Sequence, residues 1–144
     1  MINVFIGKKG SGKTKKLIDY ANKAVETSNG NVVVIEKGLK LTYDISHSAR
    51  LIDSDAYGIK GLDALEGFLC GICAGNYDVT DILLDSTLKI IGQDMTALTD
   101  LITKVKRLSE EANVTFTLSI SADESEIPAR SEERRVGKEC RSRW

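Results

Sequence analysis

The amino-acid sequence predicts an α/β protein, a three-layer α/β/α sandwich around a mostly parallel sheet. Short apolar runs alternate along the chain with longer segments whose apolar residues recur every three or four positions, the patterns of buried strands and amphipathic helices. The 144 residues, of which 42% are hydrophobic and 28% charged, suit one globular domain. No linker or repeat interrupts the alternation before residue 124. We therefore expect a single domain over residues 1–129.

A glycine-rich segment joins the first predicted strand to the first predicted helix. Residues 2–6 are a short apolar run, and residues 13–27 carry apolar side chains at helical spacing. Between them, residues 7–14 read GKKGSGKT and fit the pattern G-x-x-x-x-G-K-[ST]. Glycines let the backbone come close to an anion, toward which successive N–H groups and the helix N-terminus point. The segment therefore predicts a phosphate-binding loop.

Residues 2–27 resemble the P-loop NTPase superfamily, whose fold we expect here. The resemblance implies ATP and Mg²⁺ as cofactors. Lys13 would contact the β- and γ-phosphates and act in catalysis, and the Thr14 hydroxyl would ligate Mg²⁺. The residues expected to bind the nucleotide are Gly7, Lys8, Lys9, Gly10, Ser11, Gly12, Lys13 and Thr14.

The later elements follow from the same two patterns. Residues 32–35 are a β-branched run typical of a central strand, and residues 94–113 carry the longest helical periodicity, with Asp94 suited to cap its start. The pattern is weakest between residues 37 and 61. The other predicted elements are short strands over 41–45 and 49–53 with a turn at 46–48, a helix over 62–74, a strand over 82–84 and a strand over 114–121.

Two acidic residues end predicted strands. Asp85 follows Ile82-Leu83-Leu84, which resembles a Walker B strand, whose aspartate holds Mg²⁺. Glu36 ends the strand over 32–35, where the RecA and KaiC branches of the RecA-like ATPases carry a catalytic glutamate. The resemblance thus implies a metal role for Asp85 and a water-orienting role for Glu36. The alternative is that both are ordinary strand-end carboxylates.

The class of P-loop protein stays open between several interpretations. We expect an ATP-binding protein that hydrolyses slowly or with a partner, since Ser86, a poor base, follows Asp85. A switch that binds ATP without hydrolysis is an alternative. In a ParA/MinD-like ATPase Lys8 would be the signature lysine, but Lys9 replaces a glycine of that motif. A small nucleoside or nucleotide kinase would usually carry Asp-Glu at residues 85–86. ATP is preferred to GTP because no N-K-x-D motif occurs.

Three other polar or reactive residues carry weaker indications. His47, the only histidine, falls in a predicted polar turn and is expected to be solvated. Cys70 and Cys73 form a C-x-x-C inside an apolar helix, where half a zinc site and a redox pair are the alternatives. Because cysteine is a small buried residue and no second Cys/His pair occurs, we expect both in the core.

The last fifteen residues, 130–144, resemble the translation of a common sequencing adapter, and we expect them to be a non-native tail. They hold six of the 20 basic and three of the 21 acidic residues, so the net charge without them is −4 rather than −1. A mildly acidic domain does not support a general nucleic-acid surface. No run of 18 apolar residues and no signal peptide occur, so we expect a cytoplasmic protein without a membrane span. A protein partner is left open.

Overall fold

The computed structural model describes residues 1–122, together with the backbone of residues 134–136 and 139–142. The strands are β1 (Ile2–Gly7), β2 (Asn31–Glu36), β3 (Arg50–Asp53), β4 (Val79–Leu84), β5 (Thr115–Ser121), β6 (Arg134–Val136) and β7 (Glu139–Ser142). The helices are α1 (Lys13–Thr27), α2 (Leu62–Gly75), α3 (Thr87–Ile91) and α4 (Met95–Ala112).

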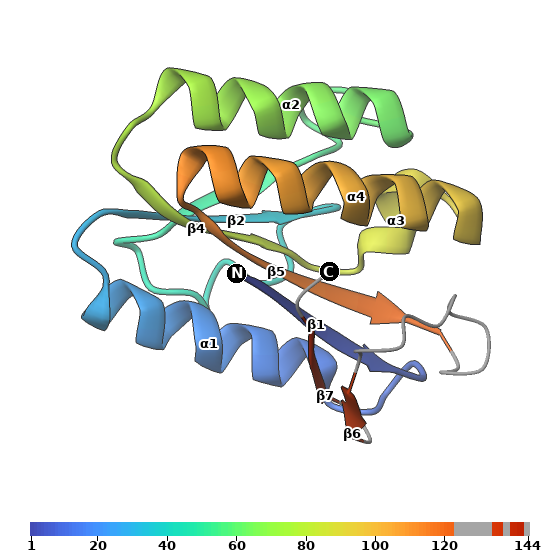
Figure 1. Cartoon of the computed structure of the whole chain (residues 1–144). Coiled ribbons are helices and arrows are strands. Elements are labelled where there is room, and N and C mark those ends of the chain that lie inside the picture. Colours follow the sequence, from blue (N-terminus) through green and yellow to red (C-terminus); the bar gives the residue numbers. More distant parts are fainter. Residues whose placement is uncertain (123–133, 137–138, 143–144) are drawn as a thin grey trace.

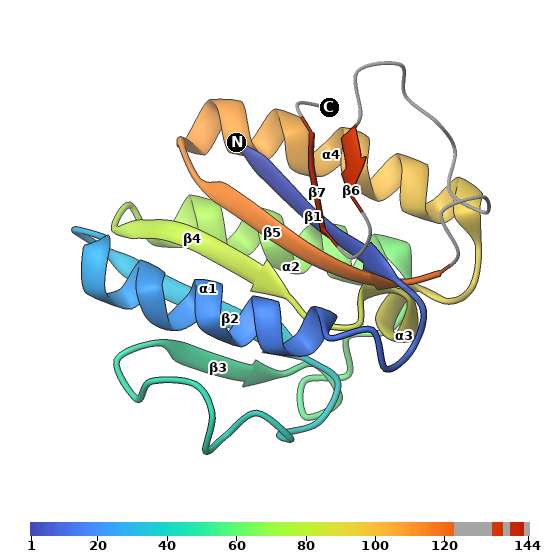
Figure 2. The same ribbon diagram turned by 90° about the horizontal axis from the view of Figure 1, so that it is seen from below.

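One sheet with the strand order β3-β2-β4-β5-β1-β7-β6 forms the middle layer. The first five strands of this order are parallel, whereas β7 and β6 run antiparallel to their neighbours. Helix α1 covers one face, and α2, α3 and α4 lie on the other (Figure 1). The predicted fold class is therefore confirmed. All five parallel strands end at the same edge, the carboxyl edge of the sheet (Figure 2).

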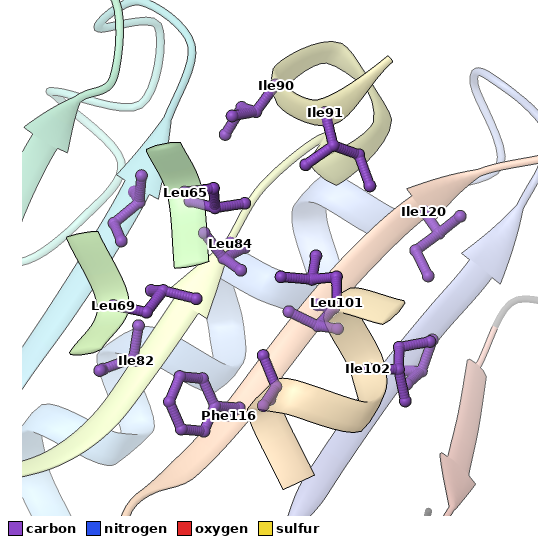
Figure 3. Packing of buried hydrophobic residues seen from close by; sticks show 14 of the residues in the cluster. Leu65, Leu69, Ile82, Leu84, Ile90, Ile91, Leu101, Ile102, Phe116 and Ile120 are labelled. Carbon is purple, nitrogen blue, oxygen red and sulfur yellow. The ribbon is translucent and has the colours of Figure 1, made fainter. Parts of the chain in front are cut away.

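The sheet has an apolar core on each face. The larger one lies beneath α2 and α4, where Leu65, Leu69 and Leu101 from the two helices belong to one cluster with Phe116 of β5 (Figure 3). These side chains are fully buried, and each contributes about 1.5–3 kcal/mol by leaving water. The smaller core, under α1, is made of Phe5, Leu17, Ala21, Ala24, Val32, Val34, Leu41, Ile45, Ala49 and Leu83. Alternating side chains along β1, β2 and β4 thus contribute apolar residues to both cores.

Both ends of α4 are capped, and the cap at its start is the one that the sequence predicts. The Asp94 carboxylate accepts a hydrogen bond from the Thr96 N–H at 2.9 Å, which satisfies one free donor of the first turn. Asn113 ends the helix in the left-handed conformation, with φ 55°.

The prediction for residues 41–45 is wrong. These residues form a turn, in which the Ile45 N–H donates to the Leu41 carbonyl at 3.0 Å and both side chains are buried under α1. Asn22 of α1 holds the turn, because its side chain donates to the Asp44 carbonyl and accepts from the Ser46 N–H. The spacing of Leu41 and Ile45 is therefore that of one helical turn. The neighbouring strand is confirmed as β3.

Two further differences concern elements that the sequence did not predict. Helix α3 has five residues, too few to show a helical period. Strands β6 and β7 fall within residues 130–144, and β7 pairs with β1, with Ile2 opposite Ser142. The outer edge of β1 offers unpaired N–H and C=O groups, which any extended segment can join. Among the helices of the described residues, none is both long and apolar enough to cross a membrane.

Candidate functional site

The loop between β1 and α1 has the backbone that its glycines predict. Gly10 and Gly12 have φ values of 82° and 91°, a left-handed conformation that side chains disfavour. The Ser11 N–H donates to the Lys8 carbonyl at 3.1 Å and closes the turn. A Cβ on Gly7 would clash with the Ser11 hydroxyl, so a larger residue there would require the Ser11 side chain to move. Gly10 and Gly12 thus supply the left-handed backbone of the loop, and Gly7 leaves space for Ser11.

Lys13 lies inside this loop rather than in solvent. Its side chain is 5% exposed, and its Nζ donates to the Lys8 carbonyl at 3.1 Å. Burial lowers the pKa of Lys13, an effect that Lys89 reinforces and Asp85 opposes. A buried ammonium group is costly unless an anion approaches it. A ligand of negative charge at this loop would therefore offset the cost of burying Lys13.

Asp85 lies next to Thr14, as the sequence predicts for a metal site. The buried Asp85 carboxylate accepts hydrogen bonds from the Ser119 hydroxyl at 2.9 Å and from the Thr14 hydroxyl at 3.5 Å. The Asp85 N–H donates to the Ile35 carbonyl at 2.9 Å, which fixes Asp85 against β2. A carboxylate and a hydroxyl are the oxygen ligands that Mg²⁺ takes beside a nucleotide. Thr14 and Asp85 would hold that ion.

Ser119 of β5 is a contact of Asp85 that sequence reasoning missed. Ser119 is 1% exposed. Its hydroxyl donates to Asp85 and accepts from the Ser86 N–H at 2.8 Å. One hydroxyl thus fixes both the carboxylate and the turn that follows it. A signal was present, because Thr115, Thr117 and Ser119 place hydroxyls on one face of the strand. Nothing in the sequence distinguishes Ser119 among them.

Lys89 of α3 was also missed. The chain turns from β4 into α3 through Ser86, one of the two non-glycine residues with positive φ in the described chain. Such a backbone is strained and is found where the surrounding structure fixes it. The turn places the exposed Lys89 near enough to Lys13 for their like charges to interact. Two cations, Lys13 of α1 and Lys89 of α3, therefore lie at the carboxyl edge of the sheet.

Glu36 ends β2 beside Asp85. Its side chain is 2% exposed, and its Oε1 accepts a hydrogen bond from the Leu41 N–H at 2.9 Å. Burial raises the pKa of Glu36, and the negative charge of Asp85 adds to this, whereas the bond from Leu41 opposes it. Glu36 thus holds the loop after β2, and it lies close enough to Asp85 for their charges to interact.

The structure brings most of the predicted site together at the carboxyl edge. Residues 7–14, Asp85 and Glu36 all lie there, with Lys8 and Lys9 at exposed positions of the loop. His47 lies exposed in a turn, as expected. Cys70 and Cys73 are both half-buried, and Cys73 packs against the larger core, so the expected core position is confirmed only in part and only for Cys73. In the described part of the chain, no group of three or more His, Cys, Asp or Glu side chains gathers as a metal cluster would.

Comparisons with known proteins extend the description of the fold. No protein-family model matches the chain, and no curated protein sequence matches it. Among solved structures, the chain is similar to a DnaB-like replicative helicase, whose structure was described together with its interactions with primase. The TM-score is 0.59 at 10% identity, over 91% of this chain and 43% of the helicase chain. The chain therefore has a mostly parallel α/β fold similar to a RecA-like helicase domain, and it spans less than half of that helicase's length.

Proposed function

We propose that the protein binds Mg²⁺-ATP at the carboxyl edge of its sheet. One observation carries the proposal: a buried lysine in a left-handed glycine loop lies at the same edge as a carboxylate–hydroxyl pair. The N–H groups of residues 10–14 and the N-terminus of α1 would hold the phosphates. Lys13 would neutralise the β- and γ-phosphates, and Thr14 with Asp85 would hold the metal ion.

Hydrolysis by the isolated chain is proposed to be slow. Phosphoryl transfer to water needs a group that orients the attacking water. The residue after Asp85 is Ser86, whose hydroxyl is a poor base, so Glu36 is the candidate for this role. The Glu36 Oε1 accepts a hydrogen bond from the Leu41 N–H, which ties the carboxylate to the loop after β2, while a carboxylate has further lone pairs that can accept from a water. A protein partner that moves residues 37–41 would therefore move Glu36 as well, and this is how we propose that a partner stimulates turnover.

The same hydrogen bond supports a second candidate function. If Glu36 serves only to hold the loop after β2 through this bond, and does not orient water, the protein binds ATP without hydrolysing it. In that case the protein acts as a switch, and a partner protein would recognise its nucleotide-bound form. The ParA/MinD-like and kinase interpretations gain no support from a specific contact in the described residues.

Phosphate release by the full chain under saturating Mg²⁺-ATP tests the proposal. We expect turnover well below the median enzyme rate of about 10 s⁻¹. Glu36→Gln keeps the acceptor for the Leu41 N–H, so it should retain ATP and lose the remaining turnover. Turnover of many per second would contradict slow hydrolysis, and unchanged turnover in Glu36→Gln would remove Glu36 from the mechanism. Binding without any release would favour the switch, and transfer to an added nucleoside would favour a kinase.

A further inference from the structure

The segment between β2 and β3, residues 37–49, lies between two parts of the proposed nucleotide site. Because β2 and β3 are parallel, it returns from the carboxyl edge of the sheet to the opposite edge, and it passes along α1 on the way (Figure 2). Such a crossover usually contains a helix, whereas this one consists of turns. Its start follows Glu36, and α1 begins in the phosphate loop. The segment therefore connects Glu36 with the helix that the phosphate loop leads into.

The backbone of Glu36 is fixed by the sheet, which leaves the direction of its side chain to be settled by other contacts. Strand β2 pairs with β3 and β4, and the Glu36 carbonyl accepts from the Ser54 N–H at 2.8 Å. Within the described residues, the buried carboxylate has one hydrogen-bond partner, the Leu41 N–H at 2.9 Å. The position of the Leu41 N–H therefore governs the direction of the Glu36 carboxylate.

Leu41 begins a turn that packs against α1. The N–H groups of Asp44 and Ile45 both donate to the Leu41 carbonyl at 3.0 Å, which closes the turn. The side chains of Leu41 and Ile45 are buried under α1. Burial of apolar side chains is not directional, so it holds the turn against the helix without fixing its orientation. A directional contact has to supply the orientation.

Asn22 of α1 makes that contact with both halves of its side-chain amide. Its Nδ2 donates to the Asp44 carbonyl at 2.9 Å, and its Oδ1 accepts from the Ser46 N–H at 2.8 Å. The two bonds hold the far end of the turn that Leu41 begins. We propose that Asn22 is a positioning residue for Glu36, because it orients this turn and thereby the Leu41 N–H to which the carboxylate is bonded.

The consequence for turnover rests on the proposed function, in which Glu36 orients the attacking water. Helix α1 starts with Lys13 and Thr14, which would contact the phosphates and the metal ion, and Asn22 lies further along the same helix. One helix would thus hold both the nucleotide and the turn that directs Glu36. Asn22→Ala should lower kcat and leave ATP affinity unchanged, because the phosphate loop keeps all its residues.

Nuclear magnetic resonance of the full chain without nucleotide tests the positioning itself. In Asn22→Ala the Leu41 amide should exchange with solvent about 5- to 150-fold faster, the range expected for the loss of two hydrogen bonds. The pKa of Glu36, followed at its carboxyl carbon, should rise, because the bond from Leu41 that lowers it is weakened. Asp53 and Asp85, which raise this pKa, lie at the ends of β3 and β4 and do not belong to the turn.

Two further variants keep the test informative. Asn22→Asp retains the acceptor for the Ser46 N–H and loses only the donor to the Asp44 carbonyl, so the exchange rate of the Leu41 amide should rise by less than in Asn22→Ala. It carries the test if Asn22→Ala does not fold, which thermal melts determine. Lys23→Ala, at the neighbouring exposed position of α1, is the matched control and should leave the exchange rate as in the unchanged chain.

The outcomes separate the positioning role from the proposed function. An unchanged exchange rate of the Leu41 amide in the folded Asn22 variants would overturn the positioning role, whether or not the protein binds ATP. An equal rise in Lys23→Ala would also overturn it, since the effect would then belong to α1 as a whole. A faster exchange and a raised pKa of Glu36 with unaltered kcat would support the positioning and contradict the role of Glu36 in hydrolysis.

Discussion

The two ends of β4 carry aspartates with different surroundings. Asp81 and Asp85 are four residues apart, and both lie on the face toward α1. The Asp81 carboxylate accepts from the Thr80 hydroxyl at 2.9 Å, and burial raises its pKa, opposed by that bond. The Asp85 carboxylate accepts from the hydroxyls of Ser119 and Thr14 and attracts the charge of Lys13. One strand thus places similar groups in two different electrostatic settings.

The difference between the two ends is our reason for proposing the phosphate and metal site at Asp85 and not at Asp81. A hollow of about 520 Å³ opens beside Asp81, lined by Tyr20, Lys23 and Thr115 among others. Asp85 lies instead beside the loop between β1 and α1, which has left-handed glycines and the buried Lys13. The number of hydrogen-bond donors and cations around a carboxylate is therefore a better guide to such a site than the volume of the hollow beside it. Three of the predictions below, for Lys13, Asp85 and Ser119, change the carboxyl edge and use a matched residue at the other edge as the control.

The largest effect is expected for Lys13→Ala. This change removes the buried ammonium group from the phosphates, and a hydrogen bond to a charged group contributes about 1.5–3 kcal/mol, or about 10- to 150-fold in affinity. Lys23→Ala changes a lysine at the opposite edge and should leave ATP affinity unaltered. Fluorescent ATP-analogue titrations measure both. Equal affinities in the two variants would show that the loop is not the binding site.

Asp85→Asn should come next, through the metal ion. Asparagine keeps the shape and removes the charge, so the increase in ATP affinity on adding Mg²⁺ should become much smaller. Asp81→Asn makes the same chemical change at the other end of β4 and should keep the full Mg²⁺ dependence. Both variants are compared by titrating Mg²⁺ at fixed ATP. If Asp81→Asn loses the Mg²⁺ dependence and Asp85→Asn retains it, the metal site lies at the Asp81 end of β4 and the proposed position is wrong.

Glu36→Gln should change stability in a pH-dependent way. The folded-state pKa of Glu36 is raised above its unfolded value, chiefly by burial, so folding favours the protonated form. The related stabilisation is present below the unfolded pKa and is lost as the pH rises through the folded pKa. Glutamine cannot ionise, so this variant should melt higher than the unchanged chain at pH 8, and the gain should disappear near pH 4. A gain that stays constant with pH would exclude ionisation as its cause.

Ser119→Ala should give a smaller effect at the carboxyl edge. It removes one hydrogen bond to Asp85 and one from the Ser86 N–H, and a typical net loss is about 1 kcal/mol per bond. We expect Mg²⁺-dependent affinity to fall several-fold. Thr115→Ala, on the same strand at the other edge, should leave that affinity intact. Urea unfolding of both variants separates a loss of fold from a loss of metal binding, and equal Mg²⁺ titrations would remove Ser119 from the site.

The smallest effect is expected from deleting residues 130–144. The deletion removes β6 and β7. Of the five parallel strands, only β1 pairs with β7. If these residues are adapter-derived, ATP affinity should be unchanged and the melting temperature should fall by no more than about 4 °C. A larger fall would mean that β7 stabilises the sheet through the edge of β1.

Local patterns predicted much of this site, and tertiary contacts account for what they missed. The glycine loop, Lys13 and Asp85 follow from short motifs whose spacing is visible in the sequence. Ser119 is one hydroxyl among several in β5, and only the pairing of β5 with β4 distinguishes it. Lys89 depends on a five-residue helix and on the left-handed Ser86, neither of which has a clear sequence signal. Residues 41–45 were predicted wrongly because Asn22 and two buried side chains decide that turn.

Calorimetric titration of ATP into the full chain, with and without Mg²⁺, tests the central claim most directly. The account predicts one nucleotide per chain, bound more tightly with Mg²⁺, because Thr14 and Asp85 would add metal contacts to those of Lys13 and the loop. An absence of binding at about 1 mM ATP would contradict the proposed nucleotide site. Binding that Mg²⁺ leaves unchanged would contradict the metal role of the Thr14–Asp85 pair.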